Sequence, residues 1–363
     1  MLVSSWGLSF GALWPVSLPS SHGEPMEVIQ QEAKLITGRR PLELIEYAAR
    51  VCYASTDKIM EGSAKPFVKA LTTRGHYTPL EHAYIHIYIN EIPDNAMRCY
   101  VHGLYHAASS GDYPWSNRSL TRGGFYRGKD DRGEYVAGNL RDVYMYMSAY
   151  DPSLELYETD AVQLASDYAV IEMITDRGVA TEFFRHRTMS YDDSGYENGY
   201  TSYSVEYVPE PSVNQQSTRY VNFSRHPFAV ILPEPFAFAY DPASAEHQTW
   251  YNTCAASIAA YQLLIEHKVA PEAARNVLPL STATTVVMSG SLLNWMYLLN
   301  LRLPKGAHPQ ARLLACKIWE LLKASYPVQR YIRDCRLDST FELCDFDKQL
   351  EEMQQLIQHN KGD

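Results

Sequence analysis

The sequence predicts an α+β fold, and three observations support this class. Segments with helical periodicity and segments with strand periodicity both occur in the chain. The predicted strands are separated by irregular lengths, which argues against a regular alternation of strands and helices. The 363 residues, of which 46% are hydrophobic, are enough to bury the core of one large domain or two modest ones.

The first half of the chain contains two predicted helices and one strand. Apolar residues recur at a helical spacing over residues 41–53. A second helix is expected over residues 65–74, ending where Gly75 can serve as the C′ residue. Residues 83–89 alternate strictly and predict a strand with its Ile residues on a buried face. Residues 91–165 are less regular, with a helix expected at 140–147. They predict an elaboration of the domain that has no hydrophobic core of its own.

The second half opens with a predicted strand over residues 168–175 and a short helix over residues 179–184. Residues 191–212 are rich in Tyr, Asp, Ser and Gly and predict a long polar loop. Extended structure is expected again before the C-terminal helices. The remaining predicted elements are extended structure at 220–232, a strand at 284–289, and helices at 244–268, from Pro271 onward, at 292–301 and at 307–324.

Composition excludes several classes of protein. The formal net charge is −10 and the sequence pI is about 5.7, which argues against non-specific binding to nucleic acid. The six cysteines form no C-x-x-C pair, which disfavours structural zinc and a disulfide scaffold and favours the cytoplasm. No apolar run is long enough to predict a membrane span. Residues 1–25 lack a basic n-region and predict a disordered leader or a start-site artefact, with Met26 as the alternative start.

Two short basic stretches predict an anion site. They are Arg185-His186-Arg187 and Ser217-Thr218-Arg219. The rigid fork of Arg matches two phosphate oxygens at once, so these residues suit a phosphate and a planar anionic ring. In an extended segment, Gln215, Ser217 and Arg219 would share one face. A solvated basic turn is the alternative interpretation, because surface Arg is common.

The order of several motifs resembles one enzyme family. Residues 185–190, continued by residues 213–220, resemble the R-H-R…S-x-R signature of the flavin-dependent thymidylate synthases. Residues 75–82 resemble the G-H-x-S/T-x-x-E-H element of that family. Residues 274–279 resemble its A-R-x-x-L-P element, and residues 301–310 resemble its late L-R…A-H/Q segment. These landmarks follow the family order across residues 26–326.

The resemblance implies a single α+β domain over residues 26–330, with a mixed or antiparallel sheet flanked by helices. Insertions are expected at about 91–167 and 191–212, and a helical tail at 331–363. The resemblance further implies a cytoplasmic homotetramer whose sites form between chains. These sites would hold FAD, deoxyuridine monophosphate (dUMP) and a folate. Methylenetetrahydrofolate would supply the carbon and NADPH the reducing equivalents, and no cysteine would attack the uracil. The chain indeed has no Pro-Cys-His element.

Two sets of site residues are implied by the resemblance, and neither includes a metal ligand. Arg302 would be catalytic, because its charge favours the anionic form of uracil. Ser217 and Arg219 would bind the phosphate of the nucleotide. His186 and Arg187 would stabilise the reduced flavin. Arg275 and Arg302 could instead cap helix carbonyls. The implied nucleotide contacts are Glu182, Phe183, Phe184, Arg185, Gln215, Gln216, Ser217, Thr218, Arg219, Arg275 and Arg302. The implied flavin contacts are Thr78, Glu81, Arg185, His186, Arg187, Gln215, Ser291 and Tyr297.

The chain departs from the family pattern in three places. Residues 191–212 interrupt the signature, either as a passive loop or as a lid. The N-L-R triplet of the family appears as Ser291-Leu292-Leu293, and Tyr297 stands where His or Asn is common. Three functions therefore remain open: a thymidylate synthase, a flavin-dependent enzyme that adds a different one-carbon unit to a pyrimidine nucleotide, and a non-catalytic nucleotide-binding homologue.

Overall fold

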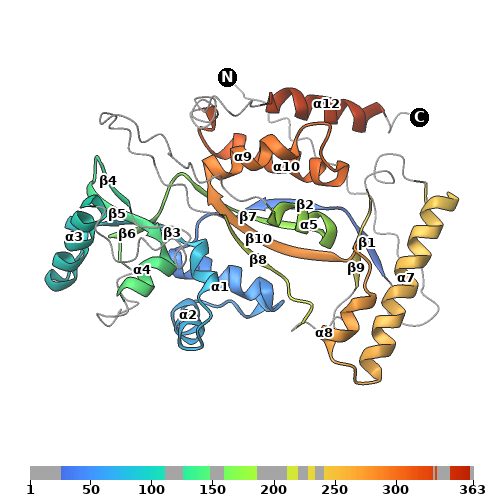
Figure 1. Cartoon of the computed structure of the whole chain (residues 1–363), viewed down its shortest axis with the longest axis horizontal. Coiled ribbons are helices and arrows are strands. Elements are labelled where there is room, and N and C mark those ends of the chain that lie inside the picture. Colours follow the sequence, from blue (N-terminus) through green and yellow to red (C-terminus); the bar gives the residue numbers. More distant parts are fainter. Residues whose placement is uncertain are drawn as a thin grey trace.

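The computed structural model describes residues 26–110, 126–147, 159–185, 211–219, 228–233, 241–329, 332 and 344–359. Within these ranges the strands form two four-stranded sheets and one two-stranded pair (Figure 1). All neighbouring strands are antiparallel except the two-stranded pair, which is parallel. The predicted α+β class, with a mixed or antiparallel sheet flanked by helices, is confirmed.

The central sheet has the strand order β2-β7-β10-β8. Its two long strands pair along their full length, from Ala283 opposite Asp176 to Ser291 opposite Tyr168. The predicted strands at 168–175 and 284–289 are therefore confirmed. Ser212 pairs with Ser289, so the last residue of the predicted polar loop already belongs to a strand. The bounds are β2 Glu32–Leu35, β7 Tyr168–Asp176, β8 Ser212–Gln215 and β10 Ala283–Ser291.

Helices cover both faces of this sheet (Figure 1). Because side chains alternate along a strand, Ile171 and Met173 of β7 belong to the core formed with the C-terminal helices. Tyr168 and Val170 of the same strand belong to the core formed with α1. The helices on the first face are α9 (Leu292–Arg302), α10 (Pro309–Ser325) and α12 (Phe346–His359), and α1 (Pro41–Cys52) lies on the second.

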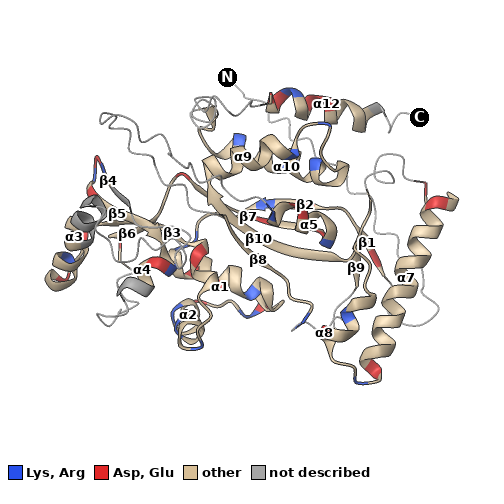
Figure 2. Cartoon of the chain, in the orientation of Figure 1, with Lys and Arg blue, Asp and Glu red and all other residues tan. Residues whose placement is uncertain are grey.

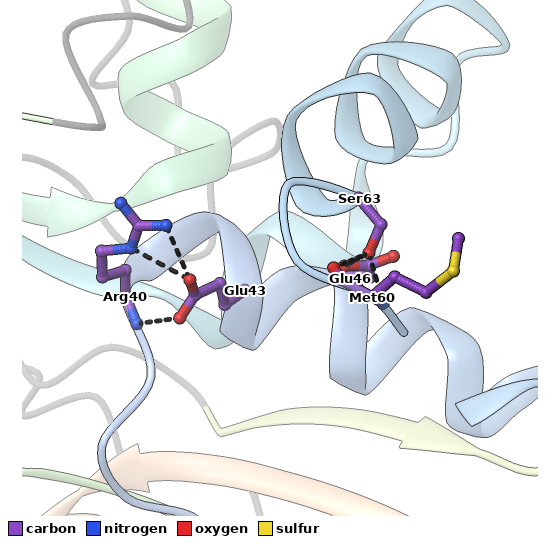
Figure 3. A network of polar contacts seen from close by, with 5 residues as sticks. All are labelled: Arg40, Glu43, Glu46, Met60 and Ser63. Carbon is purple, nitrogen blue, oxygen red and sulfur yellow. Dashed lines mark hydrogen bonds and ion pairs between the residues drawn. The ribbon is translucent and has the colours of Figure 1, made fainter. Parts of the chain in front are cut away.

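Polar contacts fix α1 against α2 (Ala64–Thr73), and both helices confirm the predictions (Figure 3). At the start of α1, the Arg40 backbone N–H and guanidinium both donate to Glu43. The Glu46 side chain is 1% exposed and accepts hydrogen bonds of 2.8 Å from both Arg50 and Ser63. Gly75, at φ +73°, follows α2 as expected. The Cys52 carbonyl at the C-terminal end of α1 accepts a hydrogen bond from the Ser217 N–H, which holds this end beside the segment that follows β8.

The second sheet has the order β4-β5-β3-β6 and is built around the predicted strand β3. Ile85 and Ile87 are fully buried, but Tyr84 and Tyr88 on the opposite face are buried too. The expectation of a single buried face is therefore wrong, because helices and strands cover both sides. The elements are β3 Tyr84–Tyr88, α3 Asn95–Ser110, β4 Tyr126–Asp130, β5 Gly133–Asn139, α4 Leu140–Met147 and β6 Val162–Leu164.

A third group of elements packs around the parallel pair β1 and β9. The predicted helix at 244–268 is confirmed, with Ser244 as its N-cap. A short helix begins at Pro271 as expected and leads into the turn that carries Arg275. The elements are β1 Glu27–Ile29, β9 Ala229–Ile231, α7 Ala245–Glu266, α8 Pro271–Ala274 and the 3₁₀ turn η7 Arg275–Val277.

Candidate functional site

The helix α5 (Arg177–Phe184) connects the central sheet to the candidate site. It begins two residues before the predicted start, because the Asp176 side chain caps it by accepting a 2.7 Å hydrogen bond from the Val179 backbone N–H. Val179 and Phe183 are buried and hold the helix against the core. Since Phe183 is 1% exposed, only its main chain can reach a ligand. Phe184 packs partly buried against the same core.

Arg302, the last residue of α9, forms a two-point contact with Glu182. Its Nη1 donates to Glu182 Oε2 and its Nη2 donates to the Glu182 carbonyl oxygen, each at 2.7 Å. The Arg302 side chain is only 15% exposed. Arg185 Nη1 lies 4.0 Å from Glu182 Oε1, and its side chain is 70% exposed. Three predicted nucleotide residues are thus brought together, two of them cationic, with one carboxylate between them.

A second group forms where the chain leaves β8. The Gln216 N–H donates to the Thr285 carbonyl at 2.8 Å, and the Ser217 N–H donates to the Cys52 carbonyl at 2.9 Å. Arg275 Nη1 donates to Thr218 Oγ1 at 3.1 Å. The structure thus brings together Arg275 and Thr218, two of the residues predicted to contact the nucleotide.

The shared face expected for Gln215, Ser217 and Arg219 is wrong. The strand ends at Gln215, and the chain turns at residues 218–219. The Ser217 hydroxyl supports this turn by accepting a 3.1 Å hydrogen bond from the Arg219 backbone N–H. As a result, Thr218 is the buried hydroxyl that contacts Arg275, while Arg219 is exposed.

Glu81 lies in the 3₁₀ turn η2 (Thr78–His82) and is already engaged in polar contacts. Its carboxylate forms an ion pair with Arg141 of α4 and accepts a 3.3 Å hydrogen bond from the Ser212 hydroxyl. Burial and the nearby Glu81 raise the pKa of Asp142 to about 7. Thr78, in the same turn, is exposed. Of the two predicted flavin contacts in η2, Thr78 is therefore accessible, and the charge of Glu81 is balanced by Arg141 from the elaboration.

The predicted flavin residues of α9 take part in the structure of that helix. Ser291 is the N-cap: its hydroxyl accepts a 3.2 Å hydrogen bond from the Asn294 N–H and donates at 2.8 Å to the Asn294 side-chain oxygen. Leu293 and Tyr297 pack partly buried against the main core. The predicted flavin residues His186 and Arg187 lie outside the described residues.

The Glu81 group and the Arg275 group lie toward opposite ends of β8. Glu81 contacts Ser212, the first residue of this strand, whereas Thr218 lies three residues after its last residue.

Two arginines in this region were missed by sequence reasoning. Arg141 comes from the predicted elaboration, and nothing in its local sequence indicates a contact with Glu81. Arg177 lies at the first position of α5, in a segment that was interpreted as a link between strand and helix. An Asp directly before the first helical residue is an N-cap signal that could have shown where α5 begins.

Comparison with known proteins identifies the family. The model of the Thy1 family, described as thymidylate synthase complementing protein, matches residues 34–108 and 167–328. The chain belongs to the Thy1 family. The unmatched residues 109–166 include α4, which carries Arg141.

Two curated proteins of the Thy1 family show how far this chain has diverged. A probable flavin-dependent thymidylate synthase of Paramecium bursaria Chlorella virus 1 is 28% identical over 165 residues, which cover 44% of this chain and 68% of the viral protein. The flavin-dependent thymidylate synthase of Synechocystis sp. is 22% identical over 162 residues, which cover 43% of this chain and 66% of the cyanobacterial protein.

Two solved structures of the UMP/dUMP methylase PolB from Streptomyces cacaoi are also similar. The complex with 5-Br dUMP is 15% identical, with coverage of 84% of this chain and 95% of PolB and a TM-score of 0.36. The complex with 5-Br UMP is 13% identical, with coverage of 84% and 93% and the same TM-score of 0.36. At this TM-score the likeness assigns neither a ligand nor an activity to this chain. No helix in the described ranges is long and apolar enough to cross a membrane.

Proposed function

We propose that this Thy1 protein is a flavin-dependent thymidylate synthase, which methylates dUMP at uracil C5. Methylenetetrahydrofolate donates the carbon, and FAD reduced by NADPH supplies the hydride. The observation that carries the proposal is the placement of Arg302, Arg185 and Glu182 in one contact group, on the motif segments that the family model matches. The names of the two curated relatives support the same activity.

The nucleotide is held at two points by arginine. Arg275 and Thr218 offer a guanidinium and a hydroxyl at one end, a combination that suits a phosphate through charge-assisted hydrogen bonds. Arg302 offers N–H groups on two terminal nitrogens, a geometry that suits the carbonyl and the adjacent ring nitrogen of uracil in its anionic form. Glu182 binds both nitrogens in the structure, and each nitrogen carries a second N–H that can donate to the substrate.

Arg302 supplies the electrostatic part of the chemistry. Uracil becomes nucleophilic at C5 when negative charge builds up on its ring. A guanidinium beside the carbonyl stabilises that charge, and its low exposure strengthens the interaction. Glu182 fixes the plane of the guanidinium before the substrate arrives.

Four of the five described cysteines are poorly suited to act as nucleophiles, and the fifth, Cys99, is exposed on α3. Burial raises the pKa of Cys52 and Cys254 to about 11 and the pKa of Cys316 to about 12. Cys344 is likewise raised, to about 11. Because the thiolate is the reactive form, these four side chains stay protonated and inert near neutral pH. The proposed route, in which no enzyme thiol attacks the uracil, agrees with this.

Two exposed hydrogen-bond donors, Arg185 and Thr78, suit the diphosphate of a flavin dinucleotide. The Arg185 guanidinium is 70% exposed and Thr78 presents an exposed hydroxyl, and both types of group bind diphosphate. When bound, the flavin would supply the hydride. Arg185 and Thr78 would hold it, while Glu81 and Ser291 keep the structural contacts described above. A second copy of the chain in a homotetramer would complete the site, as the resemblance to the family implies.

Two measurements test the proposal. The first is the absorbance of the purified protein, which should show bound FAD. The second is mass spectrometry of the nucleotide after incubation with dUMP, methylenetetrahydrofolate, FAD and NADPH, which should show thymidine monophosphate. A product of another mass would identify a different one-carbon unit and contradict the proposed reaction.

A non-catalytic nucleotide-binding homologue is the second candidate function. It is favoured by one observation: Ser291, Leu293 and Tyr297 all serve the structure of α9. Tight binding of dUMP, with neither FAD binding nor product, would establish this function instead.

A further inference from the structure

The second sheet repeats the architecture of the central sheet. The central sheet has the order β2-β7-β10-β8, and the second sheet, read from its other edge, has the order β6-β3-β5-β4. All neighbouring strands are antiparallel in both sheets. Helices α5 and α9 follow the inner strands of the central sheet, and α3 and α4 follow those of the second (Figure 1). We call β3, α3, β4, β5, α4 and β6 the inserted unit, and β2, β7, α5, β8, β10 and α9 the central unit.

The corner between the later inner strand and its helix is the same in the two units. Ser291 ends β10 opposite Tyr168, and Asn139 ends β5 opposite Tyr84. The side chains of Ser291 and Asn139 cap the helices by accepting hydrogen bonds of 3.2 and 3.0 Å from the backbone N–H three residues later. In each unit, the first N–H of the helix donates a 2.8 Å hydrogen bond to the carbonyl just before the neighbouring strand. The positions that follow each cap are therefore equivalent in the two units.

Arg141 in the inserted unit is the counterpart of Leu293 in the central unit, because each lies two residues after its cap. Residues 139–141 read Asn-Leu-Arg, the triplet that the family pattern has at residues 291–293. Leu293 packs against the main core, whereas the Arg141 side chain is 35% exposed. The cation that is missing from the corner of the central unit is thus present in the inserted unit.

Arg141 lies on the face of α4 that contacts η2. Its Nη1 donates to the Glu81 carboxylate. Tyr144, three residues later on the same face, packs against Tyr77 with 6.0 Å between the ring centroids. Thr78, which follows Tyr77, is exposed. Basic and acidic positions lie side by side where α4 begins (Figure 2). A guanidinium, a hydroxyl and two aromatic rings thus gather where η2 meets α4.

This combination of groups suits the diphosphate of a dinucleotide. A guanidinium and a hydroxyl donate to phosphate oxygens, and tyrosine rings offer flat surfaces to a base. Glu81 binds Nη1 of Arg141, and the guanidinium carries further N–H groups that can donate to a ligand. We propose that Arg141 of the inserted unit binds the diphosphate of FAD, a cationic contact that the central unit lacks at Leu293. That the dinucleotide is FAD rests on the proposed function.

The experiment compares FAD with riboflavin, which has no phosphate, by fluorescence quenching on the full chain. Arg141→Met should weaken FAD binding by about ten- to a hundredfold, because charge-assisted hydrogen bonds to the diphosphate are lost. Riboflavin should bind the parent and this variant within about twofold of each other. Arg141→Lys should give an intermediate FAD affinity, since it keeps the charge but loses the fork. Arg132→Met, which breaks the ion pair with Glu91 in the same unit, should bind FAD like the parent.

Three results would overturn the inference. The first is an Arg141→Met protein that binds FAD as tightly as the parent. The second is an equal loss of FAD and riboflavin binding, which would indicate a structural role. The third is recovery of FAD binding in the double variant Glu81→Gln/Arg141→Met, because the loss would then come from an unpaired Glu81 carboxylate. If Arg141→Met does not fold, the same comparison of FAD with riboflavin is made with Arg141→Lys.

Failure of the proposed function would be distinguishable. If the parent protein does not bind FAD, that function is wrong, and the melting temperature in inorganic pyrophosphate decides whether Arg141 forms a diphosphate site. Stabilisation of the parent but not of Arg141→Met supports such a site. Equal stabilisation of both, or of neither, refutes it.

Discussion

At the scale of single residues, Arg302 has the contacts that matter most for the chemistry. Both of its terminal nitrogens are bound to Glu182, one through the side chain and one through the main chain. A guanidinium held at two points keeps its plane, which is the arrangement that catalysis by fixed charge requires. Arg185 lies on the other side of the same carboxylate.

Replacing Arg302 should therefore affect turnover more than folding. Arg302→Met is expected to slow thymidylate formation by about 10²- to 10³-fold, as for the loss of one donor to a developing anion. Initial rates at saturating dUMP measure the effect. Lys323→Met removes an exposed partner of Asp347 far from the site and serves as the control. A rate for Arg302→Met equal to that of the control would contradict the role of Arg302.

Asp142 gives the protein a predictable dependence on pH. Its pKa is raised to about 7 in the folded state, from an ordinary value of 3.8, by burial and by Glu81. Between about pH 4 and pH 7 the folded state therefore holds a proton that the unfolded state has released, and stability falls as pH rises. Asp142→Asn should raise the melting temperature at pH 7.5 and change it little at pH 4. The opposite pattern in a thermal scan would show that the carboxylate is charged in the folded protein.

The structure brings Arg302 and Glu182, which their motifs assign to one ligand, into contact, but residues that depend on distant neighbours were missed. Arg177 was missed because the burial of its Nη1 atom and its backbone contact with Leu280 depend on a segment about a hundred positions later. Arg141 was missed because its partner, Glu81, lies on another element.

At the scale of elements, caps decide where the site residues point. Asp176 starts α5 and Ser291 starts α9, and the two helices carry Glu182 and Arg302 toward each other. Both caps are satisfied by side-chain hydrogen bonds. The precise start of each helix therefore fixes the angular position of its charged residue.

Substitutions of Ser291 can distinguish its structural role as the N-cap of α9 from a contact with the flavin. Ser291→Ala should lower the free energy of unfolding by about 1 kcal/mol, the usual value of an N-cap. Ser291→Thr keeps a hydroxyl and should recover most of that loss. FAD affinity, measured by fluorescence quenching, should be the same in both variants if the hydroxyl serves only the helix. A selective loss of FAD in Ser291→Ala would establish the flavin contact instead.

The spacing of apolar residues predicted the long helices and strands well, because buried side chains recur at regular intervals along them. The helices at 41–53 and 244–268 and the strand at 168–175 were found within two residues of their bounds. The turn after β8 was not predicted, although the Ser217 hydroxyl that supports it is local in sequence. Its position against α1 depends on the hydrogen bond from Ser217 to Cys52, which is remote in sequence. Burial of Tyr84 on β3 likewise depends on remote segments, because this side chain packs with α1 and with Tyr168 of β7.

At the scale of the whole molecule, apolar side chains are exposed beside the arginines. Leu280 is 74% exposed and its carbonyl binds the Arg177 N–H. Leu301 is 55% exposed and directly precedes Arg302 in the chain. Large apolar side chains gathered near a charged site are typical of a surface that a partner covers. A second copy of the chain is the partner expected from the proposed homotetramer.

The oligomeric state tests this expectation. Light scattering after size exclusion should give four times the chain mass of 41.3 kDa. Leu280→Ser should shift the protein toward smaller species and reduce activity with it. Leu356→Ser, at a position that is 45% exposed on α12, is the matched control and should leave the tetramer intact. A monomer in the parent protein would contradict a site shared between chains.

The most direct test of the central claim is the release of tritium from dUMP labelled at C5. The assay contains methylenetetrahydrofolate, FAD and NADPH, each also omitted in turn. We predict that tritium appears in water at a rate that depends on all three, and that Arg302→Met loses nearly all of it. Tritium retained on the uracil in the complete mixture, with dUMP demonstrably bound, would contradict the account.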